Sequence, residues 1–210
     1  RSLVRINSVN PSIAPDGAGG VFVVWEDGDL YVSASDVFAQ HLNADGTRVA
    51  GWPDGGLPIS TAPERQVGIH LAPEGAGGII TAWGDIRNTF PGEIFAQRIT
   101  WSGSVAAGWP ADGKRIIGVE TAGGVAGIAP DAAGGAYLGW QYARDPNFSD
   151  WEVYAARMLA DGSIAPGWPA GGLRLTQGLG RQMLTGVTAD SLGGVLLSWF
   201  DQADPLKAVR

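Results

Sequence analysis

The sequence predicts an all-β fold built from four copies of one short unit. Four tryptophans recur at spacings of 58, 57 and 59 residues, and each follows a glycine pair by five residues. These are Trp25, Trp83, Trp140 and Trp199. Glycine (33 residues) and proline (13 residues) make up about a fifth of the 210 residues, as expected where turns join many short strands. No stretch shows helical periodicity, so the internal repeat determines how the chain is interpreted.

Each unit begins with two strands, a and b, joined by a tight turn. Strand a covers 12–14 and its equivalents. Strand b covers 21–25, 79–83, 136–140 and 195–199, which are nearly continuous apolar runs typical of strands covered on both faces. An acidic residue before the glycine pair provides a side-chain acceptor for the turn, and the glycines allow positive φ. The acids are Asp16, Glu74, Asp131 and Asp190.

Strands c and d complete the unit. Strand c is expected at 37–42, 94–99 and 153–158, and strand d at 57–60, 115–118 and 173–176. Between them a G-W-P motif recurs, with its tryptophan at Trp52, Trp109 and Trp168. The proline biases the residue before it towards an extended backbone.

Repeated four-stranded antiparallel units of this size favour a β-propeller, with four blade modules in this chain. One such sheet cannot bury both of its faces, so the blades must stack, with the repeated tryptophans between them. We expect a single domain over 1–210, with blades at about 8–61, 65–118, 123–176 and 181–210 and an N-terminal strand at 2–7.

The two ends of the chain suggest how a ring would close. The segment 3–6 resembles strand d, and 206–210 falls where strand c of the fourth unit is due. We therefore expect 3–6 to pair antiparallel with 207–210. This pairing would give a four-bladed ring within one chain or an eight-bladed ring between two, and the small residues of the a strands favour the single chain.

Two motifs, D-x-x-G-G-x-x-x-x-W and A-Q-R-x-x-x-x-G, are present, for example from Asp16 to Trp25 and from Ala96 to Gly103. With them the chain resembles repeats of secreted bacterial β-propeller proteins, a functionally diverse and uncharacterised family. The resemblance implies a secreted, cell-surface or periplasmic location and little about activity.

Composition limits the partners. The net charge of −7 argues against nucleic acid, no apolar run is long enough to span a bilayer, and there are no cysteines. We expect no cofactor and no metal. The chain begins with Arg1 rather than methionine, so we expect a processed protein or a piece of a longer one.

The b–c loops are the candidate binding surface. In an antiparallel meander, alternate connections lie at opposite edges, so the b–c loops lie away from the repeated Asp-Gly turns and G-W-P motifs. These loops vary between units and place aromatic residues beside charges, a composition suited to recognition. The candidate ligand-binding residues are Asp29, Tyr31, Asp85, Arg87, Phe90, Tyr142, Arg144, Asp145, Phe148 and Trp151. The alternative is that these loops are simply variable solvated connections.

Other polar residues are better explained as structural. His41 occupies the position of Arg98 and Arg157 in other units, so it is expected to be a surface strand residue rather than a ligand or base. The acids that open strand c are expected to support loops, namely Asp36, Glu93 and Glu152. Asp27 and Asp29 fall short of the six or more oxygens that Ca²⁺ requires.

The sequence thus favours an extracellular binding or scaffold module that recognises a glycan or a protein, as a monomer or a ring-completing homodimer. Enzyme status stays open and leans towards no, because no nucleophile, zinc or phosphate-binding motif is present. Two alternatives remain: a polysaccharide-active hydrolase or lyase, and a purely structural slice of a larger propeller.

Overall fold

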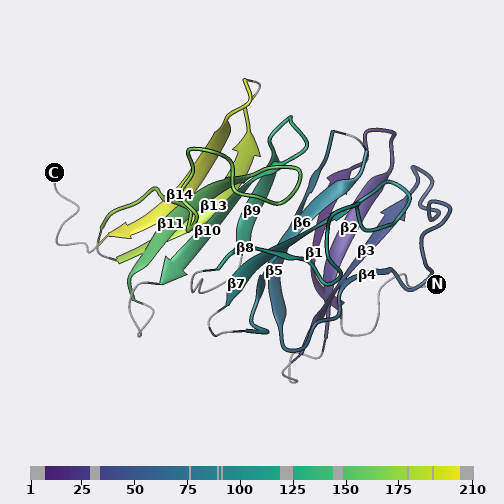
Figure 1. Ribbon diagram of the computed structural model, residues 1–210, viewed down its shortest axis with the longest axis horizontal. Coiled ribbons are helices and arrows are strands. Elements are labelled where there is room, and N and C mark those ends of the chain that lie inside the picture. Colours follow the sequence, from purple (N-terminus) through teal and green to yellow (C-terminus); the bar gives the residue numbers. More distant parts are fainter. Residues whose placement is uncertain are drawn as a thin grey trace.

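The protein is all-β in the part described by the computed structural model, as predicted (Figure 1). The described residues are 8–28, 34–75, 77–88, 90, 92–118, 125–143, 149–178, 180–190 and 192–203. They contain fourteen strands and no helix, and thus no helix that could cross a membrane. Within the named strands, all the pairings are antiparallel except one between β11 and β13.

The first two units each form a separate four-stranded meander. Unit 1 (8–61) contains β1 (Ser8–Pro15), β2 (Val21–Asp27), β3 (Asp36–Leu42) and β4 (Leu57–Ser60), in that order across the sheet. Unit 2 (65–118) repeats this order with β5 (Gln66–Pro73), β6 (Ile79–Asp85), β7 (Glu93–Ile99) and β8 (Lys114–Ile117).

The last two units share one six-stranded sheet. Unit 3 (123–176) contributes β9 (Val125–Pro130), β10 (Ala136–Ala143), β11 (Trp151–Met158) and β12 (Leu173–Arg174). Unit 4 (181–210) contributes the hairpin of β13 (Gly180–Ala189) and β14 (Val195–Ala203). The link is a single parallel pair, Trp151 with Arg181. Units 1 and 2 have an equivalent parallel bridge, Ser35 with Arg65, but there it lies outside the named strands.

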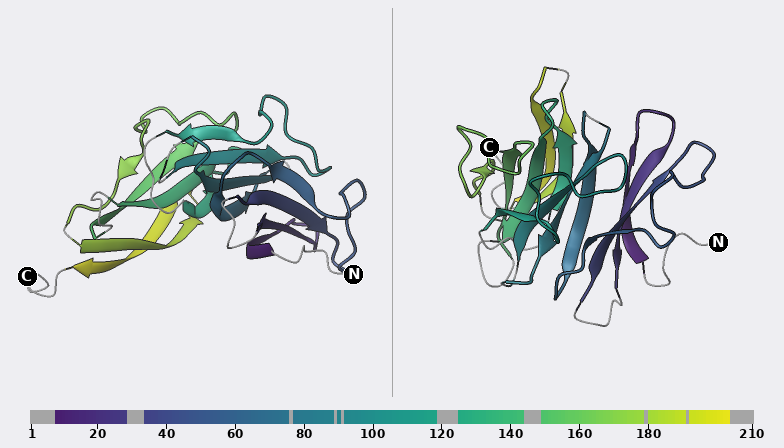
Figure 2. Two further views of the ribbon diagram at one scale, coloured as in Figure 1. Left: turned by 90° about the horizontal axis from the view of Figure 1, so that it is seen from below. Right: turned by 45° about the vertical axis from the view of Figure 1, so that its right-hand side comes forward.

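The sheets therefore contain four, four and six strands rather than four separate blades. They also form no closed ring among the described residues. The four units lie side by side in a curved row, with β1–β4 at one end and the β13–β14 hairpin at the other (Figures 1 and 2). The strand exchange expected between 3–6 and 207–210 lies outside the described residues.

The acidic turns of units 1, 3 and 4 form as predicted. The Asp16 carboxylate accepts hydrogen bonds from the backbone N–H groups of Ala18 (2.7 Å) and Gly20 (2.8 Å), and the same pattern recurs at Asp131 and Asp190. The first glycine of each pair has positive φ. The second, such as Gly20, has no room for a side chain, because a Cβ there would lie 2.2 Å from the Leu42 carbonyl oxygen.

Successive units pack face to face. We call the face of each sheet that points to the next unit its forward face, and the opposite face its rear face. Phe22 and Val24 on the forward face of unit 1 share an apolar core with Ile79 and Trp83 on the rear face of unit 2. A second core joins units 2 and 3 in the same way, and Gly139 of unit 3 lies against side chains of unit 4. The a strands meet along the row, β1 with β5, β5 with β9 and β9 with β13.

The repeated tryptophans are buried in three units and exposed in the fourth. Trp25, Trp83 and Trp140 are 2%, 0% and 1% exposed, as predicted, whereas Trp199 is 43% exposed, contrary to the prediction. Trp25 lies on the rear face of unit 1, which no described unit covers, so it is buried but not between two units. The buried rings owe much of their burial to strands c and d of their own sheet. Trp25, for example, stacks on Phe38 and lies against Gly56. Trp199 belongs to a sheet in which only strands a and b of its own unit are described.

Candidate functional site

The b–c end of the sheets contains the predicted site residues that the structure describes. Strand register places Asp85 and Tyr142 near the end of strand b, far from the acidic turns, as the meander argument predicted. The described candidates are Asp85, Arg87, Phe90, Tyr142 and Trp151. The other five, Asp29, Tyr31, Arg144, Asp145 and Phe148, lie outside the described residues.

Asp85 and Arg87 form an internal network. The buried Asp85 carboxylate accepts hydrogen bonds from the Trp83 indole (2.8 Å), from the Arg87 backbone N–H (3.0 Å) and from the Arg87 guanidinium (2.8 and 2.5 Å). The guanidinium also donates to Ser60 Oγ (3.2 Å) and to the Asp112 carbonyl (2.8 Å). Both charged groups are thus occupied by internal contacts, which ties the b–c loop of unit 2 to the neighbouring strands.

Among the acids that open strand c, Glu93 supports a loop, as predicted, and Glu152 forms an ion pair with strand d. Glu93 and Glu152 are buried, and each pairs with an arginine on strand d of its own sheet. Arg115 Nη1 lies 2.9 Å from Glu93, and Arg174 pairs with Glu152. Glu93 accepts a further hydrogen bond from an asparagine in the b–c loop. Both carboxylates are thus paired with an arginine side chain. The described residues contain no group of three or more potential metal ligands.

Aromatic side chains gather at the b–c end of unit 3. Tyr142 and Tyr154 lie on adjacent strands in an edge-to-face arrangement, with ring centroids 6.2 Å apart. Tyr154 also stacks on Trp140 at 5.8 Å. Trp151 begins β11 opposite Ala143, so the strand register places it on the other face of the sheet from Tyr142 and Tyr154. All three aromatic residues are partly exposed. Tyr154 was missed from the sequence, because its equivalents are phenylalanines in units 1 and 2.

Phe90 belongs to a different unit. It lies in the b–c loop of unit 2 and is 75% exposed. Of the five described candidates, the structure therefore places Tyr142 and Trp151 on opposite faces of one sheet end. It uses Asp85 and Arg87 internally, and Phe90 is largely exposed on a different sheet.

At the opposite end, the prediction that His41 is a surface residue is wrong. Its side chain is fully buried, with Nε2 at 2.9 Å from the Asp16 carboxylate and its ring stacked on Phe22 at 3.9 Å. The hydrogen bond from His41 is the largest influence that lowers the pKa of Asp16. Arg98 with Glu74, and Arg157 with Asp131, repeat the pair, so strand c supports the acidic turn in every unit where it is described.

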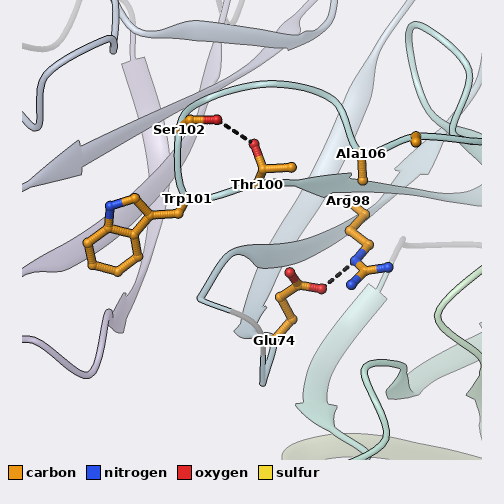
Figure 3. Close-up of a pocket in the computed structure, with 7 residues that line it drawn as sticks. Glu74, Arg98, Thr100, Trp101, Ser102 and Ala106 are labelled. Carbon is orange, nitrogen blue, oxygen red and sulfur yellow. Dashed lines mark hydrogen bonds and ion pairs between the residues drawn. The ribbon is translucent and has the colours of Figure 1, made fainter.

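A hollow of about 460 Å³ lies beside the Glu74–Arg98 pair, and sequence reasoning did not find it (Figure 3). In unit 1 the equivalent pair is covered by Trp101, whose ring meets His41 edge to face at 4.4 Å. The residue equivalent to Trp101 in unit 3 is Ala160, since their carbonyls accept the indole N–H bonds of Trp52 and Trp109 respectively. At the junction of units 2 and 3, an alanine thus stands where the previous junction has a tryptophan.

Comparisons with known proteins add little. No protein-family model and no curated protein matches the chain. Among solved structures, the chain is similar to one described as "Crystal structure of glucose dehydrogenase", with a TM-score of 0.40 and 12% sequence identity over 89% of this chain and 78% of that chain. A likeness at this level carries no argument about activity.

Proposed function

We propose that this chain is a secreted or cell-surface binding module of the β-propeller type, which recognises a glycan or a protein through the b–c end of its sheets. The observation that carries the proposal is the aromatic pair of Tyr142 and Tyr154, partly exposed beside the Glu152–Arg174 pair. Trp151 adds a third partly exposed ring at the same end of the sheet, on its other face. Aromatic rings with polar groups at their margin suit both sugar faces and protein side chains. The proposal includes completion of the stack of units into a ring.

The acids at this end favour binding over hydrolysis. A glycosidase needs two carboxylates about 5 to 10 Å apart, one of which holds a proton. Asp85, Glu93 and Glu152 are instead each paired with an arginine of their own unit, so these carboxylates are occupied by internal contacts. The hydrolase or lyase alternative would have to use other acids.

A glycan array and a polysaccharide hydrolysis screen, run side by side on the same protein, test the proposal. We expect binding without turnover. Tyr142→Ala and Trp151→Ala should each weaken binding by at least about tenfold, the scale of one lost aromatic contact, without lowering the melting temperature by more than a few degrees. Leu192→Ala is the matched control, because Leu192 is an exposed apolar residue in an acidic turn at the other end.

Turnover of any polysaccharide would overturn the proposal in favour of an enzyme. Binding that survives both aromatic substitutions would exclude the b–c end of unit 3 as the site. Absence of binding to glycans and to peptide libraries would favour the purely structural role.

A further inference from the structure

The two ends of the row of units expose surfaces that are buried everywhere else along it. On the forward faces, Phe22, Ile80 and Tyr137 occupy one repeated position and are 1%, 1% and 5% exposed. Their equivalent in unit 4, Leu196, is 61% exposed. The position is apolar or aromatic in all four units, yet in unit 4 no described unit covers it.

The neighbours of Leu196 share this exposure. Phe200 and Met183 lie opposite each other on β14 and β13, and both are exposed. Thr188 and Ser198 complete the same face and are also exposed, whereas their equivalents in unit 1, Ala14 and Val24, are buried. The forward face of unit 4 is therefore a contiguous, largely apolar sheet surface of the kind that marks an interaction site.

The rear face of unit 1 is the complementary surface. Ile13 is 68% exposed, while its equivalents Leu71 and Ile128 are 7% and 9% exposed because a preceding unit covers them. Val21 and Val23, on the same face of β2, are only partly buried. Inside the chain, the forward faces of units 1, 2 and 3 each pack against a rear face of this kind.

We propose that two copies of this chain associate head to tail, with the forward face of unit 4 in each copy packed on the rear face of unit 1 in the other. Inside the chain, a forward face packs on a rear face at each of three junctions. A contact of the same kind between two copies would cover both end faces, and this is why we choose a second copy as the occupant. Among the described residues of one chain, both end faces are exposed.

The curvature of the row favours a closed dimer. Head-to-tail contacts produce a ring where the rotation closes and an open filament where it does not. The units lie along a curve in Figure 2, so further units turn around a common centre. Two chains supply eight units, within the range of about four to eight blades found in propellers, whereas three chains would exceed it.

Sedimentation equilibrium and light scattering test the proposal with the whole chain. We expect a mass of about 44 kDa, twice the 21.8 kDa of one chain, at high micromolar concentration. Leu196→Asp on the forward face and Ile13→Asp on the rear face should each reduce the mass to that of one chain, because each substitution damages both interfaces of the ring. Leu173→Asp, at an exposed leucine on β12, is the matched control and should leave the mass unchanged.

Mixing the two variants tests whether the contact joins a forward face to a rear face. The Leu196→Asp chain keeps an intact rear face and the Ile13→Asp chain an intact forward face, so an equimolar mixture should form a heterodimer through one undamaged interface. Each variant is first shown to have the wild-type circular dichroism spectrum, so that unfolding does not mimic dissociation.

Three results would overturn the proposal. They are a wild-type protein that stays at the mass of one chain, a mass that grows without limit as in a filament, and an Ile13→Asp variant that still forms a dimer. The last would show a symmetric contact between two forward faces. Tyr142→Ala should not change the mass, so failure of this proposal is distinguishable from failure of the proposed ligand site.

Discussion

Units 2 and 4 begin with closely similar strands but differ in what covers them. In unit 2, Trp83 is fully buried, donates its indole N–H to Asp85 and lies against Gly113. In unit 4, the equivalent Trp199 is 43% exposed, and the forward face of its strand is open. The hairpin sequence is therefore not sufficient for burial. Completion of its own sheet and a following unit are what convert the same pattern into a core.

The largest expected effect is on the tryptophans themselves. Trp83→Ala should destabilise the fold by about 3–5 kcal/mol, because it removes a large, fully buried ring from the core shared by units 1 and 2. Trp199→Ala should cost about 1 kcal/mol or less in the dissociated chain, since much of that ring already contacts water. Denaturant unfolding at low protein concentration measures both. Equal losses of stability would show that Trp83 and Trp199 contribute equally to the fold, contrary to this comparison.

The next comparison is between Gly113, which lies against Trp83, and Gly193 in unit 4. A Cβ at Gly113 would lie 2.5 Å from the Trp83 ring, and its φ is +84°. Gly113→Ala should therefore cost about 2–4 kcal/mol from backbone strain plus overpacking. Gly193 in unit 4 has φ +86°, and a Cβ there would meet nothing within 4 Å, so Gly193→Ala should cost only about 1–2 kcal/mol. Thermal melts of the pair check the difference, and a smaller loss at Gly113 would contradict it.

The hollow beside Arg98 offers a gain of stability. Ala160→Trp places a ring where Trp101 lies at the previous junction, and should stabilise the protein by about 0.5–1 kcal/mol through cavity filling. Ala44→Trp is the control at the equivalent position of unit 1, where no described unit precedes it to pack against. Differential scanning calorimetry reports both melting temperatures. A loss of stability at Ala160 would show that the hollow is not a vacant tryptophan position.

The smallest effect concerns a buried acid on the forward face of unit 1. Glu26 accepts hydrogen bonds from the Gly68 backbone N–H (3.0 Å) and the Asn10 amide (3.2 Å), and burial raises its pKa above 4.5. Its equivalent in unit 3 is Gln141, which accepts from the Leu184 N–H at 2.9 Å. Glu26→Gln keeps the acceptor without the charge, so its stability should be within about 1 kcal/mol of wild type or higher near pH 7.

The raised pKa of Glu26 determines how the effect of Glu26→Gln on stability should change with pH. A carboxyl with a raised pKa binds its proton more tightly when folded, so its contribution to stability falls as pH rises from about 4.5 through the folded pKa. The stability of Glu26→Gln relative to wild type should therefore increase over that window. Thermal melts of both proteins across this pH range measure the difference. If the stability of the variant relative to wild type does not change with pH, burial of the charge is not the cause.

The fold could be predicted in part because the repeat spacing and the acidic turns are local signals. Strand existence, turn chemistry and the burial of Trp25, Trp83 and Trp140 all follow from those patterns. The division into sheets did not, since one bridging pair, Trp151 with Arg181, decides whether two units count as one sheet. The exposure of Trp199 depends on what covers its sheet, which a residue pattern does not encode.

The sequence predicted where the candidate residues lie better than it predicted what their side chains contact. Meander topology placed the b–c loops at the end opposite the acidic turns, as observed, but Arg87 is paired with Asp85, and His41 is buried rather than exposed. Ion pairs within a sheet depend on register and on side-chain reach, which loop composition does not reveal. Tyr154 was missed because it lies inside a strand whose pattern predicted only structure.

Hydrogen exchange at two protein concentrations tests the central claim most directly. If a second copy covers the forward face of unit 4, the amides of β14 should exchange more slowly at high concentration and faster on dilution below the dissociation constant. Those of β6, which neighbouring units cover within the chain, should change less than those of β14. Exchange in β14 that is the same at both concentrations would contradict the account, and the end faces would need another occupant.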